Sequence, residues 1–216
     1  ERARQWRSVQ SAVNMAERDP RVRVEPNDLD ANGMLLNVQN GTIDLETGDL
    51  RPHSKRDRIT AVSPFNYDPN ATAPRWIEFL EMMQPDEDVR LYLQRLAGSC
   101  AVGITGKETA AVHHGHGANG KTTFIESLRD TLGRDYCAEL KPETLLHAKG
   151  GSEMEHHFVV LPGRRMATTL EPDEGKKLNE SAIKRITSSE PVVARARYHE
   201  AFEFTPVCTL MMATNH

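Results

Sequence analysis

Residues 115–122, Gly-His-Gly-Ala-Asn-Gly-Lys-Thr, carry the strongest structural signal in this chain. They match the spacing G-x-x-x-x-G-K-S/T. A short apolar run over residues 110–112 precedes them, and a run with the pattern of a helix begins at Thr123 and Phe124. A strand, a glycine-rich loop and a helix in this order form the setting of a phosphate-binding loop. The alternative, a glycine-rich loop that arose by chance, is disfavoured by the flanking strand and helix signals.

The residue types of this loop fit the chemistry of a bound triphosphate. Glycines allow a tight turn whose backbone N–H groups point at the phosphates, and the following helix directs its positive end at the anion. We expect Lys121 to reach the β- and γ-phosphates and the Thr122 hydroxyl to ligate Mg²⁺. The expected ATP-binding residues are Gly115, Gly117, Ala118, Asn119, Gly120, Lys121, Thr122 and Thr123.

Length and composition are those of a globular protein. The chain has 216 residues, 38% of them hydrophobic, and a formal net charge of -4, so any nucleic-acid binding must come from a local patch. Its three cysteines are scattered without a CxxC motif, which favours reduced thiols in a cytoplasmic protein. No apolar run approaches the ~18 residues that span a bilayer, so no membrane is expected as a partner. Because the sequence starts at Glu1 and stops directly after an apolar run, we expect a fragment of a longer protein.

The first half of the chain predicts a small module of strands and helices. An Asn-Gly pair between two apolar runs is a hairpin signal, and a second turn extends the hairpin into a small β-meander. Acidic residues in a first turn complement the helix dipole and mark the start of a helix. The predicted elements are a helix over residues 1–19, strands over 35–38 and 42–45 and at Leu50, a helix over 76–83, and a helix that starts at 86 and ends near Gly103 or Gly106. We therefore expect a β-hairpin and helical module over residues 1–107 and an α/β nucleotide-binding core over residues 108–216.

A second strand of the predicted core ends in an acid. Residues 164–171 are a short, mostly small and apolar run that ends at Glu171. A carboxylate placed there in a P-loop protein binds Mg²⁺ through water or polarises the attacking water. Asp173 and Glu174 follow within three residues and could share the role. An ordinary acidic loop after an edge strand is the alternative, and the P-loop upstream favours Glu171 as a catalytic and metal-binding residue.

A third predicted strand, over residues 207–215, ends in the amide of Asn215. In an open parallel sheet the ligand binds beyond the carboxyl ends of the strands. The three strands therefore direct the loop at 115–122, Glu171 and Asn215 at one crevice. There Asn215 can hydrogen-bond the γ-phosphate or hold the attacking water. Taken alone, an asparagine that caps a turn is the simpler interpretation.

Two further predicted elements lie between Glu171 and Asn215. They are a helix over residues 178–186 and a strand, tight turn and strand over residues 191–204. Cations beside an aromatic ring suit the phosphate backbone and stacked bases of a nucleic acid. A solvated edge hairpin with ordinary arginines is an equally good interpretation of the residues alone. The candidate nucleic-acid contacts of the hairpin are Arg195, Arg197, Tyr198 and His199.

The order of these elements resembles superfamily 3 helicases, and more narrowly the helicase part of phage and plasmid primase-helicases, the group related to the poxvirus primase-helicase. The resemblance rests on five segments that together cover most of residues 35–216. They are 36–53, 115–123 as motif A, 169–175 as a variant of motif B, 178–204, and 210–215 as motif C.

The resemblance implies a P-loop NTPase core of the AAA+-like superfamily 3 type, with a truncated parallel sheet and flanking helices. It implies a homo-oligomer, usually a hexameric ring, that hydrolyses ATP with Mg²⁺ at subunit interfaces and moves on single-stranded or forked DNA. The hairpin before motif C would line the pore, and Lys184 would meet DNA or the neighbouring subunit's nucleotide. A primase domain upstream, an arginine finger after motif C and a place in the cytoplasm of a bacterial host also follow from it.

Two positions depart from the family pattern. Pro172 follows Glu171 where many members have a second acid, which leaves open whether Glu171 or Glu174 activates water. Residues 188–190, Ser-Ser-Glu, stand where Gly-Gly-Asp is common.

We expect an ATP-dependent DNA helicase or translocase core from a phage, prophage or plasmid replication protein. One alternative is a P-loop kinase acting on a small molecule, and another is an ATP-stabilised DNA-binding assembly module without motor activity. Several histidines lack the spacing of a zinc site and are expected to be ordinary loop residues. They are His113, His114, His116, His147, His156 and His157.

Overall fold

The computed structural model of the chain describes residues 2–19, 22–104, 108–115, 117, 119–146, 154–170 and 177–215. Contacts within the chain divide it into two units. The first consists of Glu1–Ala31 and Ser54–Thr60, and the second of Asn32–His53 and Ala61–His216. The whole predicted nucleotide site belongs to the second unit.

The first unit consists of the predicted N-terminal helix and two short 3-10 turns. The helix ends at Ala16, earlier than the predicted Asp19. Asp30 joins distant parts of the unit, because its carboxylate accepts hydrogen bonds from Thr60 N at 2.7 Å and from Thr60 Oγ1 at 2.5 Å. The elements are α1 (Arg2–Ala16), η1 (Pro26–Asp28) and η2 (Lys55–Asp57).

The second unit begins with the predicted β-meander. Its strands run antiparallel in the order β1-β2-β3. Val38 pairs with Gly41, so Gln39 and Asn40 form a two-residue turn. The predicted hairpin is present, but Gly41 opens β2 and does not lie in the turn, so the Asn-Gly signal placed the turn one residue too late. The Asn40 side chain fastens this turn, since it donates to Tyr67 O at 2.8 Å and accepts from Tyr67 N at 2.9 Å. The strands are β1 (Leu35–Val38), β2 (Gly41–Asp44) and β3 (Leu50–Arg51).

Two helices, α2 (Pro74–Met83) and α3 (Glu87–Ala101), follow the meander. The carboxylate of Asp86 caps α3 by accepting from the backbone N–H groups of Asp88 at 2.9 Å and Val89 at 3.2 Å. The acidic cluster therefore starts the helix where the sequence predicted.

The end of α3 returns to the start of the meander at a contact between two glycines. Gly103 N donates to Gly33 O at 2.9 Å. A Cβ atom on Gly33 would lie 2.0 Å from Gly103 O, so the two backbones can meet only because Gly33 has no side chain.

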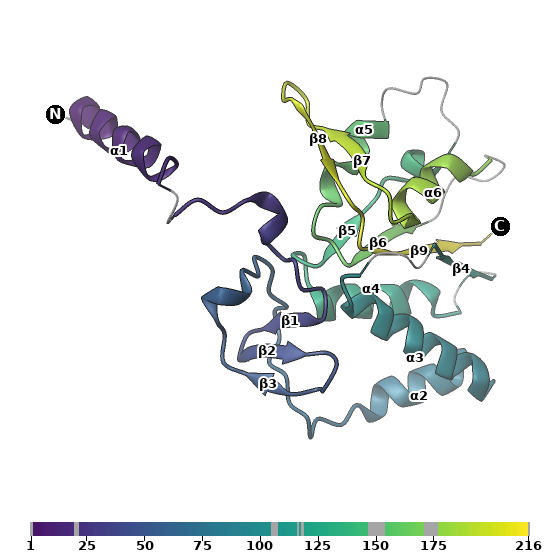
Figure 1. Ribbon diagram of the computed structural model, residues 1–216. Helices are drawn as coiled ribbons and strands as arrows, with labels where there is room; N and C mark the ends of the chain where they lie inside the picture. Colours follow the sequence, from purple (N-terminus) through teal and green to yellow (C-terminus); the bar gives the residue numbers. More distant parts are fainter. Residues whose placement is uncertain are drawn as a thin grey trace. The chain divides into compact units, whose positions relative to one another are not determined.

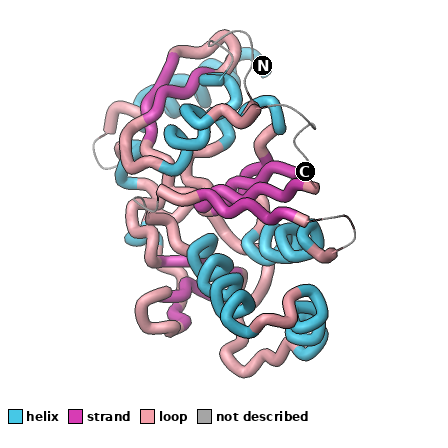
Figure 2. The backbone as a smooth tube through the Cα atoms, turned by 90° about the vertical axis from the view of Figure 1, so that its right-hand side faces the viewer, coloured by secondary structure: helices cyan, strands magenta, loops and turns pink. Residues whose placement is uncertain are grey.

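A four-stranded parallel sheet forms the centre of the second unit, in the order β4-β9-β6-β5. Figure 2 shows its strands running side by side between helices. The sequence pattern predicted that the second strand starts at Arg164, but β6 begins at Met166. The apolar run over residues 110–112 predicted a shorter first strand, but β4 extends to His114. The strands are β4 (Ala110–His114), β5 (Cys137–Glu139), β6 (Met166–Leu170) and β9 (Thr209–Thr214).

Further elements cover the two faces of this sheet. α4 and α3 lie on one side, and α6 and the β7–β8 hairpin lie on the other (Figure 1). The hairpin and the helix before it confirm the elements predicted over residues 178–204. The remaining elements are α4 (Lys121–Leu132), η3 (Pro142–Leu145), α5 (Met154–His157), η4 (Phe158–Val160), α6 (Glu180–Thr187), β7 (Val192–Arg195) and β8 (Ala201–Phe204).

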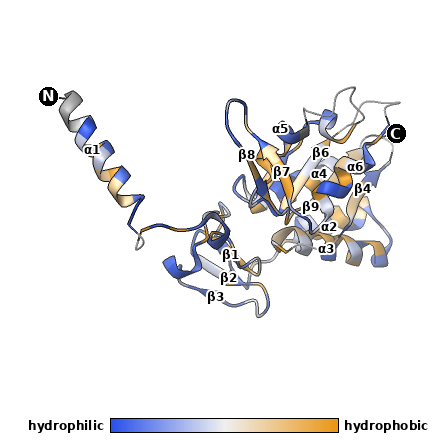
Figure 3. Cartoon of the chain, turned by 45° about the horizontal axis from the view of Figure 1, so that its top comes forward, coloured by the Kyte–Doolittle hydropathy of each residue, from blue (hydrophilic) through white to orange (hydrophobic). Residues whose placement is uncertain are grey.

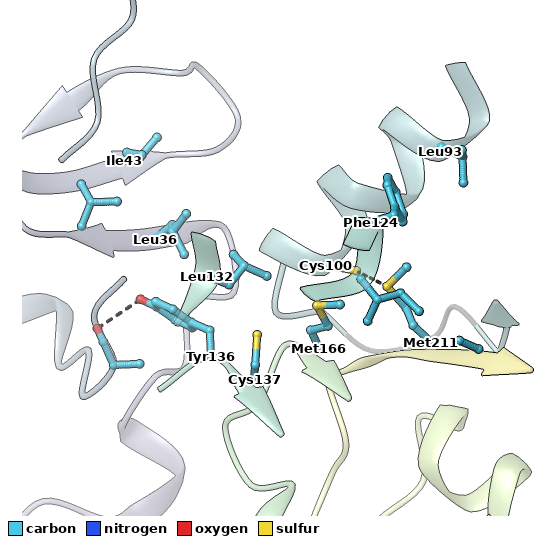
Figure 4. Packing of buried hydrophobic residues seen from close by; sticks show 14 residues of the cluster. Leu36, Ile43, Leu93, Cys100, Phe124, Leu132, Tyr136, Cys137, Met166 and Met211 are labelled. Atoms are coloured by element: carbon cyan, nitrogen blue, oxygen red, sulfur yellow. Dashed lines mark hydrogen bonds between the residues drawn. The ribbon is translucent and has the colours of Figure 1, made fainter. Parts of the chain in front are cut away.

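Successive residues of the central strands enter two separate core clusters. Met166 and Met211 pack in the first cluster, whereas Ala167 and Leu210, their neighbours in sequence, pack in the second. Side chains alternate between the faces of a strand, so each cluster marks one face, and a parallel sheet is normally covered on both. Figure 4 shows the first cluster, where meander residues meet α4 and the sheet. Leu36 and Phe124, which lie on either side of residue 107 in the sequence, share this cluster. The division into domains 1–107 and 108–216 stays a prediction.

A buried arginine joins the meander and α3 to the start of β6. Arg165 is 3% exposed, and its guanidinium donates to Leu35 O and to Ala101 O, both at 2.6 Å. The guanidinium carbon lies 4.7 Å from the centre of the Tyr136 ring, a cation–π distance. Tyr136 itself links back to the meander, since its hydroxyl accepts from Asn37 N at 3.0 Å.

Candidate functional site

The predicted phosphate-binding loop lies between the end of β4 and the start of α4. β4 ends at His114, Gly115 follows, and Lys121 is the first residue of α4. His114 pairs with Thr214, the last residue of β9, so Gly115 and Asn215 leave the same edge of the sheet side by side. The carboxyl ends of neighbouring parallel strands are where ligands bind in open α/β sheets.

Lys121 is the centre of this arrangement. Its ammonium nitrogen, Nζ, donates to Gly115 O at 2.5 Å, to Asn119 Oδ1 at 2.9 Å and to Asn215 Oδ1 at 3.1 Å. The structure therefore brings together the lysine of the loop and the amide at the end of the third strand. Three neutral oxygen ligands hold the ammonium without cancelling its charge, which leaves it attractive to an anion.

The loop approaches α4 through a glycine in the left-handed region. Gly120 has a φ of 83° and immediately precedes the helix. The positive φ favours glycine, and a Cβ atom there would also lie close to side chains, 3.0 Å from Phe79 Cε2 and 3.1 Å from Met83 Cγ. Thr122 and Thr123, in the first turn of α4, are exposed, and the first N–H groups of a helix have no partner within the helix. Their position suits an anion in front of α4.

His113 lies in β4, and His114 follows it as the last residue of the strand, so the expectation of loop histidines was wrong for both. The strand continues through them because their backbones pair with Ala213 and Thr214 of β9. Burial lowers the pKa of His113, and the positive charge of Lys121 lowers it further. Its Nε2 is buried without a hydrogen-bond partner in the part of the chain that the structure describes.

Two of the predicted site residues, Ala118 and Glu171, lie outside the described residues, as does Glu174. β6 ends at Leu170, and one of its two neighbours in the sheet is β9, which leads to Asn215. The described strand thus reaches the same edge as the phosphate-binding loop. The roles of Glu171 and Glu174 stay predictions.

The candidate nucleic-acid contacts lie at two places on the face of the sheet that α6 and the β7–β8 hairpin cover. Lys184 is exposed on α6 and is one of the side chains from this helix and its two ends that line a pocket of about 560 Å³. Arg195, at the end of β7, and Arg197, Tyr198 and His199, in the turn after it, are all exposed. Figure 3 shows the contrast between the hydrophobic strand β7 and the hydrophilic turn. Tyr198 has a φ of 65° and a fully exposed ring.

The expectation of loop histidines was also wrong for His156 and His157, which lie on α5. The structure ties His156 to this hairpin. Its Nδ1 lies 2.5 Å from the carbonyl oxygen of Arg195. The spacing of the histidines could not reveal this contact, because the two residues come from separate segments that meet only in the fold. Thr169 is a second missed position, since its Oγ1 on β6 is buried without a partner among the described residues.

Comparison with known proteins places the chain in a family. Residues 1–85 match the family described as "D5 N terminal like", and residues 113–216 match a family of unknown function, DUF5906. Protein L207/L206 of Acanthamoeba polyphaga mimivirus, which is named as a helicase, is 31% identical over 193 residues. Protein C962R of African swine fever virus, which is named as a primase, is 25% identical over 195 residues.

The chain belongs to the viral and phage primase-helicase family. The two viral relatives match 86% and 87% of this chain, and the chain spans only 20% of the length of each. What this primase-helicase segment contributes to a whole protein is therefore a matter for proposal.

Solved structures show the fold of this primase-helicase segment. Two structures of the C-terminal region of NrS-1 superimpose with TM-scores of 0.52 and 0.54, at 11% and 12% sequence identity. Each match covers 70% of this chain and 38% or 37% of the other. Among the described residues, no helix has both the length and the apolar character needed to cross a membrane.

Proposed function

We propose that this chain is the ATP-binding and ATP-hydrolysing core of a helicase that moves on single-stranded or forked DNA. The observation that carries the proposal is the contact of Lys121 with Asn215 at the carboxyl edge of the parallel sheet, directly in front of α4. A cation, an amide and the free N–H groups of a helix meet at one point, as the phosphates of a nucleotide require.

The residues present fit ATP and Mg²⁺. Lys121 and the N–H groups of the first turn of α4 would hold the phosphates, and Gly120 allows the backbone to approach them closely. The exposed hydroxyl of Thr122 would ligate Mg²⁺, with Glu171 as the predicted carboxylate. When bound, Mg²⁺ neutralises the charge that develops on the phosphates. Asn215 would orient the attacking water or contact the γ-phosphate.

The packing supports a link between this site and the proposed DNA contacts. Leu210 and Met212 of β9 share the second core cluster with Val192 and Ala194 of β7. A shift of β9 that follows the nucleotide state would therefore reach the strand that carries the hairpin. This arrangement supports the proposal that Arg195, Arg197, Tyr198 and His199 grip the DNA strand, with Lys184 nearby on α6.

The family resemblance supports the remaining features of the proposal. They are a homo-oligomeric ring, hexameric in related helicases, with ATP at the subunit interfaces and an arginine finger outside this chain. A primase domain in the full-length protein and a place in the cytoplasm of the host cell complete it.

A strand-separation assay on a forked DNA duplex tests the proposal in the full-length protein. We expect ATP-dependent separation that Lys121→Ala abolishes while the folded content stays the same by circular dichroism. Phosphate transfer to a small acceptor without strand separation would instead support a kinase. ATP-dependent DNA binding without strand separation would support an assembly module.

A further inference from the structure

The turn of the β7–β8 hairpin is held by a side chain from outside the hairpin. His156 lies on α5, and its Nδ1 is 2.5 Å from the carbonyl oxygen of Arg195, the last residue of β7. A carbonyl oxygen can only accept, so His156 Nδ1 must carry the proton and donate it. The contact fixes the point where the paired strand ends and the turn begins.

Arg195 in turn shapes the rest of the turn. Its Nε donates to His199 O at 3.3 Å, and His199 N donates to Ala196 O at 3.1 Å. Between these bonds, Tyr198 adopts the left-handed conformation, with a φ of 65°, which is unfavourable for a residue with a large side chain. The turn therefore depends on the bonds around it to keep this conformation.

An open pocket of about 670 Å³ lies between α5 and this turn. We call it the hairpin pocket, and His156 and residues 195–200 line it. Arg195 and Arg197 outnumber the single acid, Glu200, so the pocket favours an anion. In the described part of the chain, the side chains of Arg197, Tyr198 and His199 have no hydrogen-bond or ion-pair partner of their own, which leaves them available to a ligand.

We propose that His156 is a positioning residue for nucleic-acid binding. Because His156 holds the Arg195 carbonyl, it fixes the turn that presents Arg197, Tyr198 and His199. A backbone phosphate of single-stranded DNA then binds in the hairpin pocket. The inference rests on the proposed function of the hairpin and adds a residue from a different element to it. The neighbouring His157 offers a contrast, because its Nδ1 lies 2.8 Å from Thr144 Oγ1 and serves a contact away from the hairpin.

The experiment measures the dissociation constant for a labelled single-stranded oligonucleotide by fluorescence anisotropy, in the full-length protein and at fixed salt. His156→Phe keeps a ring and removes both nitrogens, and His156→Gln restores an N–H donor. Loss of one hydrogen bond predicts that His156→Phe weakens DNA binding roughly 2- to 12-fold, whereas His156→Gln stays within about twofold of the wild type. His157→Gln serves as the control on the same helix and should bind DNA like the wild type.

Arg197→Ala separates this inference from the proposed function. If Arg197→Ala weakens DNA binding and His156→Phe does not, the positioning role is overturned while the DNA-binding hairpin stands. If neither Arg197→Ala nor Tyr198→Ala changes DNA binding, the hairpin is not the DNA interface and both fall. If His156→Gln fails to restore the affinity lost in His156→Phe, a hydrogen bond to the Arg195 carbonyl is not what His156 contributes. A melting curve of each variant shows that the folded protein is being compared.

Discussion

Lys121 Nζ lies 3.1 Å from Asn215 Oδ1, although the two residues are 94 positions apart in the sequence. The distance results from the parallel pairing of β4 with β9, which places the ends of both strands at one edge of the sheet. In a P-loop protein, a lysine at this position neutralises phosphate charge, and a polar residue on the adjacent strand can detect the terminal phosphate. The proposed catalytic role of Asn215 follows from this proximity.

Replacing Asn215 by alanine should impair hydrolysis more than nucleotide binding. The amide would act mainly when the water attacks, so we expect kcat for ATP to fall roughly 10²-fold, with little change in the dissociation constant for ATP. Steady-state kinetics and binding of a fluorescent nucleotide measure the two effects, with Asn70→Ala on an exposed loop as the control. A loss of nucleotide affinity without a loss of kcat would show that Asn215 holds the ground state instead.

The two kinds of contact in the hairpin turn should respond differently to salt. Under the proposed DNA-binding role, Arg197→Ala would remove one phosphate contact. The slope of the logarithm of the DNA association constant against the logarithm of salt concentration should then shrink by about one. Tyr198→Ala would remove the ring proposed to stack on a base and should cost about 1–3 kcal/mol of binding free energy with the slope unchanged. Titrations at several salt concentrations distinguish the two. Equal effects of both variants on the slope would contradict this division of roles.

The buried Arg165 should be important for stability. Arg165→Met removes the guanidinium and leaves the carbonyl groups of Leu35 and Ala101 without their donor, so we expect the free energy of unfolding to fall by about 3 kcal/mol. Urea denaturation measures this loss, and hydrogen exchange should show weaker protection in β1. Arg164→Met is the matched control, because the Arg164 guanidinium bonds the carbonyls of Arg134 and Asp135 where water can replace it. Equal losses in the two variants would contradict the role of burial.

Much of the local structure could be predicted from the sequence, because its causes are local. The hairpin around Asn40-Gly41, the acidic cap at Asp86 and the order of strand, loop and helix around residues 115–122 each depend on a few adjacent residues. The burial of Arg165 could not be predicted, since its partners at Leu35, Ala101 and Tyr136 come from three distant segments. In the sequence, Arg165 stands next to Arg164, and two adjacent arginines ordinarily indicate exposed side chains.

The candidate site likewise combines a contact that the sequence predicts with one that it does not. The convergence of the predicted phosphate-binding loop with Asn215 could be expected from the rule for parallel sheets, whereas the contact of His156 with Arg195 could not. It depends on how α5 packs against β7, which no spacing in the sequence specifies.

His113 should make stability depend on pH. Its pKa in the folded protein is lowered from 6.5 by burial, and secondarily by Lys121, so the unfolded chain binds the proton more readily than the folded one. The free energy of unfolding should therefore decrease as the pH falls through 6.5 and level off below the folded-state pKa. His113→Phe keeps a ring against Phe124 and should remove this part of the pH dependence. Chemical denaturation of both proteins between about pH 7 and about pH 5 measures the difference, and parallel curves would show that His113 does not contribute.

The central claim is that this chain converts ATP hydrolysis into movement on DNA, and the rate of ATP hydrolysis with and without single-stranded DNA tests it most directly. The measurement compares the full-length wild type with Lys121→Ala. We predict strong stimulation by DNA in the wild type and no hydrolysis above background in the variant. A rate of hydrolysis that DNA does not change, or one that survives in Lys121→Ala, would contradict the claim.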